Sequence, residues 1–171
     1  LFFVFVFANL SGIFAADLAE THNKIKQAVE ARQYSAAVAE LRTFQTSNAR
    51  VFEANNYDYL LARMAESDGD VSTAIANYQI VVNRDSILKA YALFHLARIF
   101  RESGNLLLER LYLTKLSIES PGSLLVPSAR ERLAKSSFES SNFGESVRIL
   151  TSNNIEKASP AVARFLREDN A

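Results

Sequence analysis

Four short breaks interrupt the helix-forming stretches of this chain at nearly equal distances. The apolar residues that close these breaks, Tyr34, Val71, Leu106 and Phe143, lie 37, 35 and 37 residues apart. A period of roughly 34 to 40 residues with a break in its middle is typical of an array of helical hairpins. Two of the breaks contain Gly69 and Gly104, which suit a helix C-terminus because glycine adopts a positive φ without steric penalty.

Second breaks separate one hairpin from the next, as at Asn83–Ser86 and Glu119–Gly122, and they contain Ser, Asn or Asp able to cap the following helix. Each predicted helix has an apolar stripe too wide to leave in water, so neighbouring hairpins must stack. We therefore predict an all-α, right-handed α-solenoid of about four stacked helical hairpins, forming one domain over residues 17–171. The predicted helix pairs are about 17–31 with 35–47, 54–67 with 71–83, 87–103 with 105–119 and 126–140 with 143–152. An unpaired helix at about 159–169 predicts that the array continues past Ala171, so the chain is expected to be a fragment.

Composition excludes several classes of protein. Apolar residues make up 49% of the chain and charged residues 22%, as in an ordinary globular protein. Lys+Arg and Asp+Glu are both 19, so the net charge is zero and provides no overall field to hold a nucleic acid. Cysteine is absent, and the only two histidines, His22 and His95, are far apart. We therefore expect no disulfide, no metal site and no cofactor.

The segment Leu1–Ala16 differs from the rest because it is mostly apolar and has no charged residue. It is too short to cross a membrane as a helix, which takes roughly 20 residues, so no stable membrane span is expected. It is typical of the core of a secretory signal peptide, with Ala15 and Ala16 at the cleavage site. We predict export, to a bacterial periplasm. Eukaryotic secretion, a truncated membrane anchor and a buried first helix are the alternatives.

The hairpins also share a residue pattern. An apolar–small pair, a later aromatic residue, a glycine before the turn and an alanine in the second helix recur, as in Leu61-Ala62, Gly69, Ala74 and Tyr78, and in Leu96-Ala97, Phe100 and Gly104. Over about residues 17–152 this pattern resembles the tetratricopeptide repeat, a resemblance that implies an α-solenoid engaged in protein–protein interaction. At Glu109 and Ser146 the chain departs from the family, which prefers a small apolar residue there.

A narrower resemblance concerns Ser120–Leu150, SPGSLLVPSARERLAKSSFESSNFGESVRIL. With the predicted leader, this segment is similar to the helical superhelix that precedes the catalytic domain of soluble lytic transglycosylases, and to related periplasmic envelope proteins. In the transglycosylases the activity belongs to a later lysozyme-like domain with a catalytic Glu, and no segment of this chain matches that domain. The resemblance therefore implies an accessory region and no catalytic residue.

Residues that could perform chemistry have simpler explanations. The carboxylate pairs Glu66 with Asp68 and Glu109 with Glu119 are expected to be solvated surface charge, and His95 is expected to be a packing or surface residue. No nucleophile elbow and no glycine-rich phosphate loop is present. No enzymatic activity is predicted for this segment, and a transglycosylase activity would need a downstream domain.

A basic residue recurs eight positions before each break-closing apolar residue, at Lys26, Arg63, Arg98 and Lys135. Equivalent positions of first helices line the concave face of a stacked array. With Tyr59, Tyr91 and Phe94, these cations are our candidate partner-binding residues, for a protein or peptide partner or for peptidoglycan. The alternative is that they form intrahelical pairs with the acids four residues later, Glu30, Glu102 and Glu139.

Overall fold

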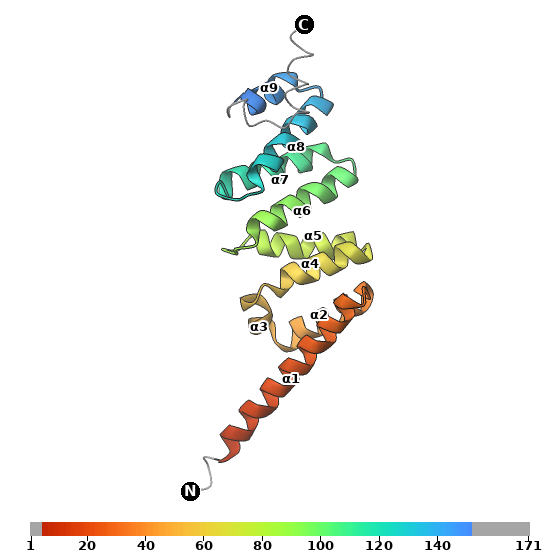
Figure 1. The fold of residues 1–171 in the computed structure, drawn as a ribbon, viewed down its shortest axis with the longest axis vertical. Helices are drawn as coiled ribbons and strands as arrows, with labels where there is room; N and C mark the ends of the chain where they lie inside the picture. The colour runs from red at the N-terminus through yellow and green to blue at the C-terminus, as the bar shows by residue number, and fades with distance from the viewer. Residues whose placement is uncertain (1–4, 152–171) are drawn as a thin grey trace. The chain divides into compact units, whose positions relative to one another are not determined.

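The computed structural model describes the backbone of residues 5–151 and the side chains of residues 18–151. All regular secondary structure in this range is helical (Figure 1). The helices are α1 (Phe5–Glu30), α2 (Tyr34–Ser47), α3 (Ala49–Ala54), α4 (Tyr57–Asp68), α5 (Val71–Val82), α6 (Lys89–Glu102), α7 (Leu106–Glu119), α8 (Val126–Glu139) and α9 (Phe143–Thr151). The prediction of an all-α protein is therefore confirmed for the described residues.

The chain forms two compact units, residues 1–80 and 81–171. In the first unit α2 packs against α1 and α4, and the short α3 contacts both α2 and α4. In the second unit α7 packs against α6 and α8, and α8 packs against α9. Successive helices thus pack on one another within each unit, an arrangement compatible with a tetratricopeptide-like repeat.

One turn geometry recurs at all four predicted breaks. A residue with positive φ follows the first helix of each hairpin: Arg32, Gly69, Gly104 and Ser141. The next residue donates its N–H to the carbonyl five residues earlier, at 2.8–2.9 Å: Gln33 to Ala28, Asp70 to Ala65, Asn105 to Phe100 and Asn142 to Ser137. This Schellman arrangement satisfies the last carbonyls of a helix. The spacing seen in the sequence is therefore a repeat of backbone geometry.

The residue four positions after each of these donors is buried near the start of the second helix. These residues are Ala37, Ala74, Glu109 and Ser146. The two alanines allow neighbouring helices to approach closely, whereas Ser146 donates its hydroxyl to the carbonyl of Ala134 at 2.9 Å. Both departures from the family pattern, Glu109 and Ser146, are thus packed inside and need polar partners there.

Two helices differ from the prediction. Helix α1 begins at Phe5, twelve residues before the predicted start at 17, because no proline or charged residue interrupts the segment that precedes Asp17. The unpredicted α3 is held by Phe52, which is 1% exposed and packs its ring on Phe44 at 5.8 Å. The other bounds agree within three residues, and the predicted helix 159–169 lies outside the described residues.

The signal peptide predicted at residues 1–16 stays a prediction. Of the helices that the structure describes, none has both the length and the apolar character needed to cross a membrane.

In the first unit, Asp70 joins two hairpins at the start of α5. One of its carboxylate oxygens accepts the Thr73 N–H at 3.1 Å and the Ser72 hydroxyl at 2.8 Å. The other accepts from Arg42 of α2 at 3.2 Å, and Arg42 also donates to the Thr73 hydroxyl. The hydrogen bonds from Thr73, with that from Ser72 and the charge of Arg42, lower the pKa of Asp70 to about 2 from an ordinary value of 3.8.

The lowered pKa predicts a pH dependence of stability. Because the folded pKa is below the unfolded one, the contribution of Asp70 is complete above about pH 4 and is lost as the pH falls through about 2. The Asp70→Asn variant keeps a good capping side chain but cannot titrate. Urea unfolding at several pH values should show that its stability falls less steeply than that of the natural chain between about pH 4 and 2. Parallel curves for the two proteins would contradict this account of Asp70.

Candidate functional site

The structure places the four predicted cations on the first helices of the hairpins. Lys26 is on α1 and Arg63 on α4, both in the first unit, whereas Arg98 is on α6 and Lys135 on α8, both in the second unit. The aromatic candidates follow the same division, with Tyr59 on α4 and both Tyr91 and Phe94 on α6. Each unit therefore contains two of the four predicted cations.

In the second unit, side chains join the first helices of successive hairpins directly. The guanidinium carbon of Arg132 on α8 lies 4.8 Å from the ring centroid of Phe94 on α6, within cation–π range. Arg101 of α6 donates to both carboxylate oxygens of Glu139 on α8, at 2.9 and 3.0 Å. These long side chains connect α6 and α8, both of which pack on α7.

Residues spaced three or four positions apart along α6 and α8 extend these contacts into one surface. We call it the α6–α8 face. It consists of Tyr91, Phe94, Arg98 and Arg101 of α6 with Arg132, Lys135 and Glu139 of α8. The four sequence-predicted residues of the second unit thus lie on a pair of helices that contact each other.

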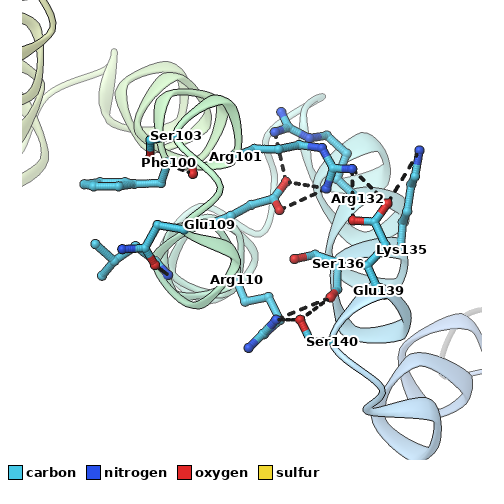
Figure 2. A network of polar contacts seen from close by, with 12 residues as sticks. Phe100, Arg101, Ser103, Glu109, Arg110, Arg132, Lys135, Ser136, Glu139 and Ser140 are labelled. Atoms are coloured by element: carbon cyan, nitrogen blue, oxygen red, sulfur yellow. Dashed lines mark hydrogen bonds and ion pairs between the residues drawn. The ribbon is translucent and has the colours of Figure 1, made fainter.

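A buried carboxylate lies beneath this face (Figure 2). Glu109 of α7 is 0% exposed and forms salt bridges with Arg101 and Arg132, each at 3.1 Å. Figure 2 shows Arg101 shared between Glu109 and Glu139, so that one network connects α6, α7 and α8. The hydrogen bonds from Arg101 hold the pKa of Glu139 below its ordinary value.

The prediction that Glu109 is solvated surface charge was wrong. Glu109 occupies the position that alanine takes in the first two hairpins, where the second helix faces its neighbours. A long carboxylate at this position must reach between helices, and the two arginines compensate its charge. His95, in contrast, is buried on α6, in agreement with a packing role.

Three of the four predicted cations form the intrahelical pairs that their spacing allows. The nitrogen–oxygen distances are 3.8 Å for Lys26–Glu30, 3.8 Å for Arg98–Glu102 and 3.9 Å for Lys135–Glu139. Such long, solvent-exposed pairs contribute about 0–1 kcal/mol each. Lys135 can therefore turn toward a ligand at small cost, whereas Arg98 also hydrogen-bonds His95 at 3.3 Å. Arg101 and Arg132 are held by shorter contacts.

The candidate residues of the first unit are more involved in packing. Tyr59 is half-buried, with its ring edge on Tyr78 at 5.8 Å, and Arg63 is also half-buried. Tyr78 is itself buried and donates its hydroxyl to Glu66 at 2.7 Å. Only Lys26 of the candidates in this unit is an exposed side chain.

The sequence interpretation missed four residues of the second unit: Arg101, Glu109, Arg132 and Glu139. A signal for the two arginines was present, because each lies three residues from a predicted cation and therefore on the same helical face. The signal for Glu109 was its departure from the repeat pattern. Glu139 had been considered only as a partner for Lys135, whereas its closest cation is Arg101.

The α6–α8 face offers guanidinium, ammonium, carboxylate and aromatic groups, which can form ion pairs and ring contacts. Within residues 18–151, no cluster of three or more histidine, aspartate and glutamate side chains could hold a metal ion. No protein-family model matches the chain, and no curated protein matches it significantly. The resemblance to soluble lytic transglycosylases thus has no support from these comparisons. The fold, an all-helical array of hairpins, stays compatible with a tetratricopeptide-like repeat.

Proposed function

We propose that this chain is a non-catalytic helical-repeat binding module that holds a peptide or protein partner on the α6–α8 face. In this proposal the hairpins stack as a right-handed solenoid, whose first helices line a concave surface. The partner meets an aromatic residue at Phe94 and exposed cations at Arg98 and Lys135, so acidic segments are preferred.

The main support is the contrast between held and available side chains on this face. The buried Glu109 network fixes Arg101 and Arg132, and Arg132 in turn holds the ring of Phe94. Lys135 has a side-chain exposure of 67% and a long pair with Glu139 of its own helix. Arg98 has a side-chain exposure of 43%, and it pairs with Glu102 at 3.8 Å and hydrogen-bonds His95 at 3.3 Å. A surface whose anchors are already ordered loses less entropy when a partner binds.

The double variant Arg98→Ala/Lys135→Ala tests the proposal. Its circular dichroism should match that of the natural chain, and its free energy of unfolding should stay within about 1–2 kcal/mol, because both ion pairs that it removes are exposed and the hydrogen bond of Arg98 to His95 is long, at 3.3 Å. Capture of an acidic partner from a cell-envelope extract should fall about tenfold at low salt, and the difference should shrink as salt is added.

Arg148→Ala on α9 is the matched control, since Arg148 is 70% exposed, pairs with Glu145 of its own helix and is not a residue of the α6–α8 face. Capture by this control should equal that of the natural chain. If the double variant folds normally and captures the same partners in the same amounts, the α6–α8 face is ordinary solvated charge.

A further inference from the structure

Two loops that precede α6 and α8 share one construction. Ser86-Ile87-Leu88 and Ser123-Leu124-Leu125 are 37 residues apart. In each loop the serine hydroxyl oxygen accepts the N–H two residues later, at 3.1 Å from Leu88 and 3.2 Å from Leu125. The serine carbonyl accepts the N–H three residues later, from Lys89 and from Val126. The chain therefore builds the same tight turn twice in the second unit.

Each turn holds an aliphatic side chain in water. The middle residues, Ile87 and Leu124, are 87% and 93% exposed. Single exposed apolar residues are common on protein surfaces, but here the same exposure recurs at equivalent positions of successive hairpins. Exposed apolar side chains that lie together are typical of an interaction site.

The two turns border one groove of about 360 Å³. Its apolar lining includes Ile87, Leu124 and the half-exposed ring of Tyr91. Its serines are Ser86 and Ser123 of the turns and Ser120 at the end of α7. The volume is near the lower end of the range for ligand pockets, about 300–1,000 Å³, and suits one or two side chains of a peptide.

The charges of the groove favour a basic occupant. Glu119 at the end of α7 is neutralised by Lys89 of α6, at 3.5 Å. Asp85 is exposed on the groove lining, and no salt bridge between described residues includes it. The uncompensated charge is therefore negative, which attracts a lysine or arginine and disfavours the anionic surface of a membrane.

We propose that this groove binds an extended segment of a partner protein in which an aliphatic residue neighbours a basic one. The aliphatic side chain lies between Ile87 and Leu124 and against Tyr91, and the basic side chain lies beside Asp85. The site goes beyond the proposed function, because it uses the loops before α6 and α8 and does not depend on Arg98 or Lys135.

The probe for this site is an acetylated pentapeptide, Ser-Leu-Lys-Leu-Ser, titrated into the ¹⁵N-labelled full chain and followed by NMR. Shift changes should be confined to residues 85–91 and 119–125. Ile87→Ser/Leu124→Ser should weaken binding about tenfold, because the apolar area buried by the peptide is lost. Asp85→Asn should remove the preference for this peptide over Ser-Leu-Glu-Leu-Ser. Leu107→Ser is the matched control, because Leu107 is 70% exposed on α7 and does not line the groove.

Three results would each overturn the proposal. The first is an absence of shift changes in the two loops at millimolar peptide. The second is an equal loss of binding in Leu107→Ser. The third is the appearance of the same shift changes with vesicles of phosphatidylglycerol and phosphatidylcholine, which would identify a membrane surface as the occupant. None of these results bears on the Arg98 and Lys135 test, so the two proposals fail separately.

Discussion

Replacing both Arg101 and Arg132 by methionine is expected to lower the free energy of unfolding by about 3–5 kcal/mol. Glu109 is 0% exposed, and each of these arginines lies 3.1 Å from one of its carboxylate oxygens. Without them the buried carboxylate loses both cations and has no water to replace them. Urea unfolding followed by circular dichroism measures the loss.

Two further variants separate this explanation from a simple loss of packing. Adding Glu109→Leu to the double variant should restore most of the lost stability, because an apolar set of similar volume needs no charge compensation. Arg148→Met should change the free energy of unfolding by no more than about 1 kcal/mol, since its pair with Glu145 is exposed. If the Arg101 and Arg132 double variant also stays within about 1 kcal/mol of the natural chain, Glu109 reaches water and the network is not a structural requirement.

Phe44→Ala is expected to have a comparable effect in the first unit, a loss of about 3–5 kcal/mol. Phe44 is 1% exposed on α2, and its ring lies 5.7 Å from His22, 5.8 Å from Phe52 and 5.1 Å from Tyr57. These rings come from α1, α3 and α4, so the truncation opens a cavity where four helices meet. Urea unfolding of the full chain measures the change.

Phe143→Ala is the matched control for this second prediction. Phe143 also packs edge-on against another ring, that of Phe138 at 5.1 Å, but it is 54% exposed at the start of α9. Its truncation should cost less than about 1 kcal/mol, because water already covers much of the ring. Equal losses for Phe44→Ala and Phe143→Ala would mean that the aromatic cluster does not hold α1, α3 and α4 together.

Much of the fold could be predicted because its repeating unit is local. A hairpin break needs a left-handed residue and a following donor, and both are set within six residues of chain. Gly69 and Gly104 indicate two such breaks in the sequence. The spacing predicts the other two breaks, where Arg32 and Ser141 adopt the positive φ in place of glycine. The helix periodicity and the period of the breaks therefore predicted seven helices to within three residues.

Elements without a local signal were missed. Helix α3 has six residues, too few for a clear apolar period, and it depends on the burial of Phe52 against Phe44. The aromatic cluster around Phe44 was missed for the same reason, since His22 and Tyr57 stack at 5.4 Å only after α1 and α4 have packed.

The candidate site shows the same difference between features with a local sequence signal and features that depend on tertiary packing. By itself, the sequence determined the all-helical hairpin array. It also determined the positions of Tyr91, Phe94, Arg98 and Lys135 on first helices, because helix periodicity and the spacing of the breaks are both local patterns. Only the tertiary structure decided which charges are buried, which are paired and which stay available. Glu109 and Lys135 are both ordinary charged residues of a helix. Glu109 is enclosed because side chains of α6 and α8 cover it, whereas Lys135 keeps 67% of its side chain exposed. Burial depends on neighbours brought together from distant parts of the chain, and no local pattern encodes it.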